Sequence, residues 1–345
     1  MKAFQYVNPA SERDAVAALG TERNRILPMA GGMDLLGLMK DYIVSPERVV
    51  NLKGLDGAIT ADGNRQSADG RDRQPAGGNR QSGGFRIGAA AKVADVAEHA
   101  ELRKLYPALV TAAEEVGTPQ IRNMGTVGGN LMQRPRCWYF RNEEFHCLKK
   151  GGARCFAVEG ENQYHAIFGD GPCHIVHPSS LAVPLIAYGA RVRVLGPGGA
   201  REIDLGEFYQ LPNQNLYGET VLQPNEIVTH VILPPSGPER SASYEVRVKQ
   251  SHDWPLALAS VHLVMAVDVV KSARVVLGAV APVPWRVPGA ERVLAGRAVD
   301  QAVATEASVA AVAGARAMSG NAYKIQIAKT AVKRAILKAA GLPVA

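Results

Sequence analysis

Short blocks of apolar residues, separated by glycine and proline turns, divide the first 60 residues into strands and helices. Residues 11–19 have apolar side chains at helical spacing behind Ser11, a residue type that favours a helix N-cap. Residues 25–30 form an apolar run that leads into Gly31 and Gly32, residues 34–40 suit one or two helical turns, and residues 49–52 suit a second strand. This order predicts a small α/β unit over residues 1–58.

The middle of the chain begins with a segment that has no hydrophobic periodicity. Between residues 60 and 84 the pentapeptide Gly-Asn-Arg-Gln-Ser occurs twice among small and polar residues, which predicts a mobile loop. Strand-like residues resume at 85–88, and residues 93–116 have the apolar spacing of one long helix. Residues 191–195 alternate polar and apolar, as a half-exposed strand does.

The last third of the chain changes from strands to helices. Residues 227–233 form an apolar strand that ends at two prolines, and residues 260–270 and 273–281 suit antiparallel strands joined by a short turn. Residues 301–316 and 322–340 have helical apolar faces. Strands followed by helices predict an α+β domain over residues 223–345, after a second domain over residues 59–222.

Length and charge limit the function classes. At 345 residues the chain is long for a single core, which supports two or three domains. The formal charge of +7 comes from dispersed basic residues, with no basic and aromatic cluster that would indicate nucleic-acid binding. No apolar run is long enough to cross a bilayer, and the N-terminus lacks the apolar core of a signal peptide. We therefore expect a soluble chain with no export signal of its own.

All four cysteines lie within one segment, at Cys137, Cys147, Cys155 and Cys173. Buried cysteines that act only as small apolar residues have no reason to gather, whereas gathered thiolates hold iron–sulfur clusters or zinc. Several cationic side chains flank these cysteines, and nearby cations favour the thiolate. The wide spacing favours an iron–sulfur cluster over a zinc ribbon, with zinc, disulfides and coincidence as the alternatives.

Two glycine-rich turns are candidate phosphate sites. Gly31 and Gly32 follow an apolar strand and precede a predicted helix, which places free backbone N–H groups and the positive end of a helix dipole together. Gly128 and Gly129 lie between a threonine and an asparagine, whose side chains add donors. Each turn alone is more often structural than functional, and neither matches the dinucleotide-binding G-x-G-x-x-G pattern or a P-loop.

Together these motifs resemble the flavin-binding subunit of molybdenum hydroxylases, the xanthine dehydrogenase and aldehyde oxidoreductase family. The resemblance extends over the chain apart from residues 60–84 and is carried by residues 30–36, 120–123, 125–131, 177–182, 278–286 and 290–296. Most members pass directly from the third of these motifs to the fourth, whereas here a cysteine segment, residues 136–174, intervenes. This insertion resembles the branch whose flavin subunit also carries a [4Fe–4S] cluster, such as the bacterial periplasmic aldehyde oxidoreductases.

The resemblance implies an α+β fold: a two-part FAD-binding domain of the vanillyl-alcohol-oxidase (PCMH) type, followed by an α+β domain of the CO-dehydrogenase flavoprotein type. It implies a [4Fe–4S] cluster on Cys137, Cys147, Cys155 and Cys173, and no catalytic side chain. FAD would lie between the first two parts of the chain. The residues implied to bind it are Leu27, Pro28, Met29, Ala30, Gly31, Gly32, Met33, Asp34, Leu35, Thr118, Arg122, Gly125, Thr126, Gly128, Gly129, Asn130 and Ser180.

The implied function is electron transfer within a molybdenum-containing aldehyde or N-heterocycle oxidoreductase. Electrons would pass from two [2Fe–2S] clusters of a small partner subunit through FAD to an external acceptor, for example a ferredoxin-like protein. A large partner subunit would hold the molybdopterin cofactor. Alternatives are a subunit of a 4-hydroxybenzoyl-CoA-reductase-like enzyme, a zinc-stapled assembly subunit without catalysis, and a self-sufficient oxidase of the covalent-flavin fold. The compartment would be the cytoplasm, or the periplasm if a signal-bearing partner carried the chain there.

Two positions depart from the family pattern. Met33 stands where threonine or asparagine is usual, which removes a side-chain donor to the diphosphate. Ser180 replaces an aspartate, which shortens or removes an acceptor. Because most phosphate contacts in such sites come from backbone N–H groups, both changes are compatible with FAD.

Overall fold

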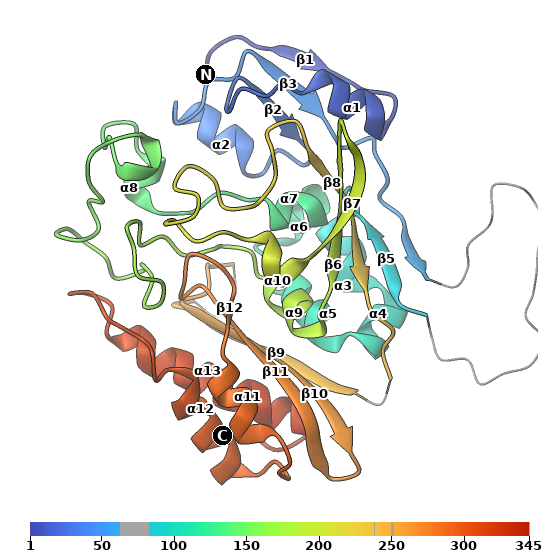
Figure 1. The fold of residues 1–345 in the computed structure, drawn as a ribbon, viewed down its shortest axis with the longest axis vertical. Helices are drawn as coiled ribbons and strands as arrows, with labels where there is room; N and C mark the ends of the chain where they lie inside the picture. Colours follow the sequence, from blue (N-terminus) through green and yellow to red (C-terminus); the bar gives the residue numbers. More distant parts are fainter. Residues whose placement is uncertain (63–82, 238, 250–251, 345) are drawn as a thin grey trace, which may run out of the picture.

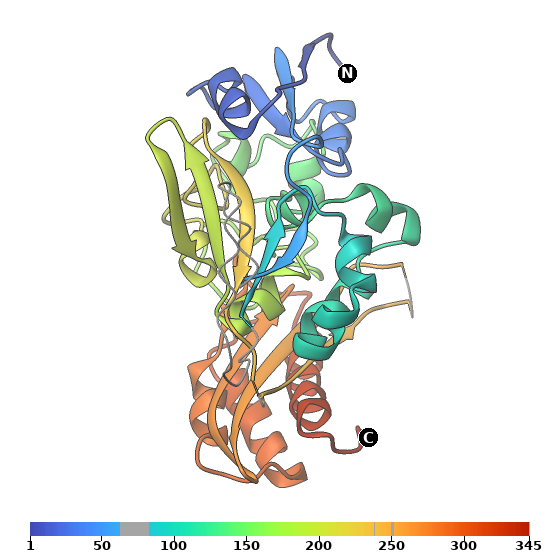
Figure 2. The same ribbon diagram turned by 90° about the vertical axis from the view of Figure 1, so that its right-hand side faces the viewer.

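The computed structural model describes residues 1–62, 83–237, 239–249 and 252–344, which form three sheets with their helices (Figure 1). Most of the low-complexity segment for which the sequence predicts a mobile loop, residues 63–82, lies outside the described residues. The N-terminal and C-terminal units lie at opposite ends of the molecule, with the middle unit between them (Figures 1 and 2).

The N-terminal unit is the α/β unit that the sequence predicts. Its parallel sheet has the order β1–β3–β2, with β1 (Gln5–Val7), β2 (Ile26–Met29) and β3 (Arg48–Asn51), and its helices are α1 (Glu12–Ala18) and α2 (Leu35–Lys40). The Ser11 hydroxyl accepts a hydrogen bond from the Asp14 N–H at 3.1 Å and caps α1, as predicted. In the central strand, Val50 packs with α1 and Val49 packs with α2, so both faces of the sheet are covered.

The middle unit is built on a five-stranded antiparallel sheet of order β4–β5–β8–β6–β7. Its strands are β4 (Ile59–Ala61), β5 (Phe85–Gly88), β6 (Arg191–Gly196), β7 (Gly199–Asp204) and β8 (Ile227–Leu233). Residues 227–233 are predicted from the sequence to begin the third domain, but they form β8, which pairs with both β5 and β6 and therefore belongs to the middle sheet. The register aligns Ile87 and Val192 with Val231, and the burial of this apolar row explains the pairing.

Three short helices replace the single helix predicted over residues 93–116: α3 (Val93–Glu98), α4 (Ala100–Leu105) and α5 (Pro107–Glu114). The His99 side chain accepts the Leu102 N–H at 3.3 Å and starts α4, while Pro107 starts α5 because it has no N–H to continue α4. The apolar spacing therefore predicts the buried face correctly, but it does not indicate the two additional helix starts. The unit is completed by α6 (Pro119–Met124), α7 (Val127–Leu131), α9 (Ala182–Tyr188) and α10 (Leu205–Phe208).

The C-terminal unit is an antiparallel sheet covered by helices. The sheet has the order β12–β11–β10–β9, with β9 (Glu239–Val246), β10 (Ala257–Ala266), β11 (Val269–Gly278) and β12 (Trp285–Arg286). Its helices are α11 (Pro288–Leu294), α12 (Gln301–Ala311) and α13 (Tyr323–Ala340). A fully buried row on α13, which includes Ala328, Val332 and Ile336, faces this core. The predicted hairpin and the two predicted helices are confirmed, with ends shifted by a few residues.

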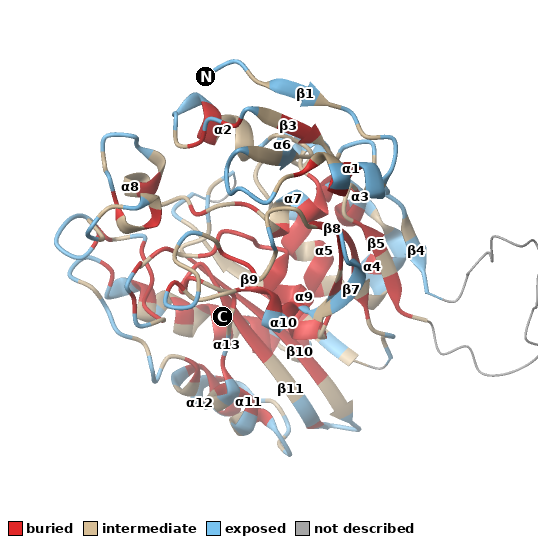
Figure 3. Ribbon diagram, turned by 45° about the horizontal axis from the view of Figure 1, so that its top comes forward, coloured by how far each residue is buried: buried red, intermediate tan, exposed pale blue. Residues whose placement is uncertain are grey.

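The cysteine segment has little regular structure. It contains the short helix α8 (Trp138–Arg141) and the 3₁₀ helix η1 (Leu148–Lys150). Phe140 and Cys147 pack with Leu38 and Met39 of α2 in a small apolar cluster, separate from the main cores. Figure 3 shows that the loops around α8 combine exposed and buried stretches, and the contacts of Phe140 and Cys147 with α2 place part of this segment against the N-terminal unit.

Candidate functional site

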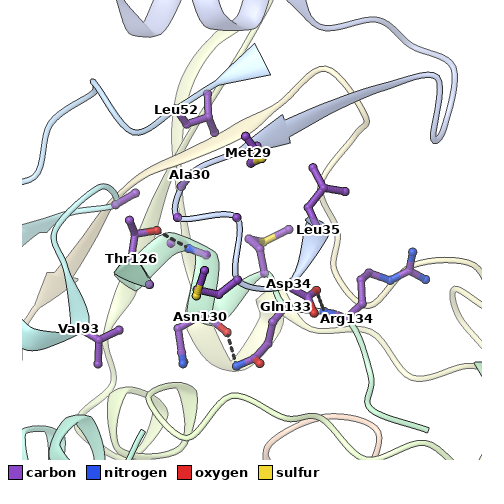
Figure 4. A pocket seen from close by; sticks show the side chains of 18 of the residues that line it. Met29, Ala30, Asp34, Leu35, Leu52, Val93, Thr126, Asn130, Gln133 and Arg134 are labelled. Atoms are coloured by element: carbon purple, nitrogen blue, oxygen red, sulfur yellow. Dashed lines mark hydrogen bonds between the residues drawn. The ribbon is translucent and has the colours of Figure 1, made fainter. Parts of the chain in front are cut away.

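A cavity of about 460 Å³ lies where the N-terminal unit, the middle unit and the loop between β9 and β10 meet. This volume is typical of a site for a small molecule or cofactor. Both glycine-rich turns line the cavity, and Figure 4 shows Ala30 and Asp34 of the first near Thr126 and Asn130 of the second. Of the residues implied to bind FAD, the following line it: Leu27, Pro28, Met29, Ala30, Gly31, Gly32, Met33, Asp34, Leu35, Thr118, Gly125, Thr126, Gly128, Gly129, Asn130 and Ser180.

The turn between β2 and α2 presents a row of free backbone donors. The N–H groups from Gly31 to Leu35 donate no hydrogen bond to any residue that the structure describes. Gly31 packs tightly on α6, since a Cβ built there would lie 1.9 Å from the Met124 carbonyl oxygen. Gly32 has a φ of +73°, which favours glycine. Successive free N–H groups in a turn form a concave anion site, so this wall suits a phosphate or diphosphate.

The second glycine turn contributes shape rather than free donors. Thr126 caps α7 by accepting the Gly129 N–H at 3.1 Å, and the Gly128 N–H donates to the Ala89 carbonyl at 2.9 Å. A Cβ at Gly128 would lie 2.9 Å from the Ala89 Cβ, so glycine is needed there for close packing. The expectation that both turns offer free glycine N–H groups therefore holds for the first turn only.

Arg122 is the implied FAD-binding residue that does not line the cavity. Its guanidinium donates to the carbonyl oxygens of Val116 at 3.1 Å and Gly117 at 3.4 Å, and so it holds the turn before α6. Met33, at one of the two positions that depart from the family pattern, is 45% exposed at the edge of the cavity. Ser180 is buried on the opposite wall.

The Asp34 side chain connects the first glycine turn to the cysteine segment. Its carboxylate accepts the Arg134 N–H at 2.8 Å, and it pairs with Arg136 at 2.8 Å and with Arg141 at 2.6 Å. Figure 4 shows Asp34 facing Arg134 beside the turn. The sequence motif predicts Asp34 at the cofactor site, but nothing in the sequence indicates these contacts, because their partners lie about a hundred residues away along the chain.

Some residues that line the cavity come from the C-terminal unit and are not among the site residues predicted from the sequence. Residues 252–255, in the loop between β9 and β10, line the mouth of the cavity. Trp254 is 49% exposed, and the Arg136 guanidinium lies 4.7 Å from the centre of its ring, a cation–π distance. The one signal in the sequence was the tryptophan–proline pair between two predicted strands, and it did not indicate where the loop would lie.

The cysteine side chains approach one another within the cysteine segment. The thiols of Cys155 and Cys173 interact, and this interaction lowers the pKa of Cys155 while raising that of Cys173. Burial raises the pKa of the Cys137 thiol to about 11, and the neighbouring Cys155 and Cys147 add to this effect. Within the described residues, no three His, Cys, Asp or Glu side chains are grouped closely enough to hold a metal ion. Four sulfur donors on one segment nevertheless have the chemistry that suits an iron–sulfur cluster or zinc.

A buried histidine lies beside the cysteines. The Nε2 atom of His165 is 3.3 Å from the Cys137 Sγ, while its Nδ1 has no partner in the described part of the chain. Burial lowers the pKa of His165 to about 4, so the ring is neutral at pH 7 and can donate its Nε2–H to a thiolate. The His165 carbonyl accepts hydrogen bonds from Asn321 and Lys324 of the C-terminal unit, which positions the ring.

A buried ion-pair group holds the other side of the cysteine segment. Glu219 pairs with Arg134 at 2.7 Å and with Lys149 at 2.8 Å, and the Lys149 side chain is almost fully buried. Although burial raises the pKa of the Glu219 carboxyl, the two cations outweigh it and lower the pKa overall. Arg134 also lines the cavity, so this group connects the cavity wall with the segment that carries the cysteines.

Comparisons with known proteins assign the family. Residues 73–236 match the family described as the FAD binding domain in molybdopterin dehydrogenase, and residues 242–339 match the CO dehydrogenase flavoprotein C-terminal domain. The chain is 34% identical to the aldehyde oxidoreductase FAD-binding subunit PaoB of Escherichia coli, over 98% of this chain and 99% of that protein. It is 25% identical to the carbon monoxide dehydrogenase medium chain of Hydrogenophaga pseudoflava, over 96% of each.

The fold of the chain is similar to that of a chain in a solved structure of CO dehydrogenase. The chain superposes on a chain of reconstituted CO dehydrogenase from Oligotropha carboxidovorans with a TM-score of 0.73, at 23% identity and 99% coverage of both chains. In the part of the chain that the structure describes, no helix has the length and apolar character needed to span a membrane. The matched domains, the full-length relative and the cavity together identify the chain as an FAD-binding subunit of the molybdenum hydroxylase family of oxidoreductases.

Proposed function

We propose that this chain transfers electrons between a molybdenum-containing partner and an external acceptor, as the medium subunit of an aldehyde oxidoreductase. The observation that carries the proposal is the row of free N–H groups from Gly31 to Leu35 on the wall of a cofactor-sized cavity. Those groups fit the diphosphate of FAD, and the family match supports FAD as the ligand. When bound, FAD supplies the exchange of one or two electrons.

The residues of this chain would bind and orient the cofactor rather than carry out acid–base chemistry. The first glycine turn would hold the diphosphate, while Gly128 allows α7 to pack closely against Ala89, in the turn that follows β5. Apolar side chains such as Leu27, Leu52 and Val93 would exclude water from the cavity. No side chain is assigned as a general acid or base.

The cysteine segment would hold a [4Fe–4S] cluster on Cys137, Cys147, Cys155 and Cys173. The interaction between the thiols of Cys155 and Cys173 and the approach of His165 to Cys137 support a shared sulfur site. Sulfur ligands and nearby hydrogen-bond donors are what such a cluster requires. The cluster would lie next to the FAD cavity, because Asp34 ties the two together.

The partners would be a large molybdopterin-containing subunit and a small subunit with two [2Fe–2S] clusters, with an acceptor such as a ferredoxin. The relative with 34% identity belongs to an aldehyde oxidoreductase, which supports an aldehyde as the substrate of the whole enzyme. The chain would act in the cytoplasm, or in the periplasm if a partner with an export signal carried it there.

An anaerobic absorption spectrum of the purified chain, before and after dithionite, tests the proposal together with the iron and zinc content. We expect flavin bands on a broad iron–sulfur shoulder that bleaches on reduction. Flavin with zinc and no shoulder would keep the flavoprotein function and overturn the cluster. A colourless chain that cannot take up FAD would overturn the proposed function.

A further inference from the structure

The cations between the FAD cavity and the cysteine segment outnumber the carboxylates that pair with them. Arg136 and Arg141 share the single carboxylate of Asp34, and Arg134 and Lys149 share that of Glu219. All six side chains are at most 28% exposed, so bulk water solvates their charges poorly. Four cations against two carboxylates leave an excess of two positive charges at one end of the cavity.

Most of the other carboxylates at the cavity are already paired and do not offset this excess. Glu12, Asp56, Glu115 and Glu226 pair with Arg193, His230, Arg247 and Arg201, respectively. Asp253 also lines the cavity and forms no ion pair within the described residues, since it accepts only the backbone N–H groups of Lys249 and Trp254, so it offsets at most one of the two excess charges. Of these four cations, Arg134 and Arg136 line the cavity, whereas Arg141 and Lys149 belong to the cysteine segment and do not line it.

Arg136 is a cavity-lining cation with unused hydrogen-bonding capacity, whereas the Nε of Arg134 lies 2.7 Å from a Glu219 carboxylate oxygen. Its Nη1 pairs with Asp34, and its Nη2 donates to the Gln133 Oε1 at 3.1 Å. Its Nε–H is buried and has no partner among the residues that the structure describes. The guanidinium is held in place by the Trp254 ring, 4.7 Å away. A guanidinium stays protonated at neutral pH, so Arg136 has one buried N–H without a partner, and its charge shares the single carboxylate of Asp34 with Arg141.

We propose that Arg136, a residue of the cysteine segment, binds the diphosphate of FAD and supplies charge that this dianion neutralises. The proposal rests on the proposed function, because it takes FAD as the ligand. The free N–H groups from Gly31 to Leu35 are joined to Arg136 through Asp34, so the backbone donors and the guanidinium lie on one wall. The cysteine segment thereby contributes to cofactor affinity as well as holding thiols.

Ligand binding to the full-length chain, freed of flavin, tests this assignment. The probes are FAD and ADP, which contain the diphosphate, and riboflavin, which does not. Arg136→Gln should weaken FAD and ADP by about tenfold, the expected effect of losing a charge-assisted hydrogen bond, and leave riboflavin unchanged. Arg136→Lys keeps the charge and should retain part of the affinity. The control Arg191→Gln removes a 55% exposed arginine on β6 that pairs with Glu202, and should bind all three ligands as wild type does.

The outcomes separate this inference from the function on which it rests. If wild type binds FAD and Arg136→Gln binds FAD and ADP equally well, the inference is overturned while the flavoprotein function stands. Equal weakening of FAD and riboflavin would assign Arg136 to the shape of the cavity and also overturn it. A wild-type chain that binds neither FAD nor ADP would overturn the proposed function and this inference together. Circular dichroism of each variant verifies the fold.

Discussion

Replacing Asp34 with alanine should loosen the cysteine segment from the N-terminal unit. Within the described residues, neither Arg136 nor Arg141 pairs with any other carboxylate. The same carboxylate accepts the Arg134 N–H at 2.8 Å. The substitution therefore removes three contacts at once and leaves two guanidinium groups without a counter-charge.

The size of the effect follows from burial. Removing one partner of a fully buried ion pair costs about 3–5 kcal/mol. The side chains of Asp34, Arg136 and Arg141 are 18%, 28% and 14% exposed, so water recovers part of the loss. We expect the free energy of unfolding to fall by about 3 kcal/mol in Asp34→Ala. Asp34→Asn keeps an oxygen acceptor for the Arg134 N–H and should lose about half as much.

Urea denaturation of the full chain, followed by circular dichroism, measures this change, and iron content reports whether the segment keeps its thiols in place. Glu159→Ala is the matched control, because Glu159 is 83% exposed and pairs with Arg154 at 3.6 Å. That control should change the free energy of unfolding by less than about 0.5 kcal/mol. If Asp34→Ala stayed within about 1 kcal/mol of wild type with full iron content, the anchoring role of this carboxylate would be refuted.

Three further predictions concern the cofactors and acid stability. Cys155→Ser should lose iron and keep most of the FAD, since the cysteines do not line the cavity, and a parallel loss of flavin would contradict separate sites. Gly129→Val should lower FAD occupancy by about tenfold, measured from the flavin absorbance, because a side chain there meets only the Thr126 Oγ1 at 3.0 Å and otherwise extends toward the cavity. Burial lowers the pKa of His177 to about 4 in the folded chain. As the pH falls from about 6.5 to 4, the unfolded chain binds a proton at His177 before the folded chain does, so the free energy of unfolding decreases over this range. His177→Gln should remove about 3 kcal/mol of that acid destabilisation in urea titrations at pH 7 and pH 4, and an unchanged pH dependence would exclude His177 as its source.

Local patterns were sufficient for much of the fold and for one wall of the site. The Ser11 cap, the glycines at the start of α2 and the C-terminal hairpin each depend on residues close together in the chain, and all three are present. The prediction of one continuous helix over residues 93–116 was wrong, because new helices start at His99 and Pro107 without a change in the apolar spacing. Apolar periodicity indicates which face of a helical segment is buried, but it does not indicate where one helix ends and the next begins.

The sequence by itself determined the family and the gathering of cysteines in one segment, and it predicted the order of the units and the first glycine turn as an anion site. The tertiary structure alone decided that β8 joins the middle sheet, that Asp34 turns toward three arginines, and that Arg136 and Trp254 meet at the mouth of the cavity. The physical reason is range. Caps and turns are set by hydrogen bonds between near neighbours, whereas these ion pairs and ring contacts join segments about a hundred residues apart and exist only after the units pack.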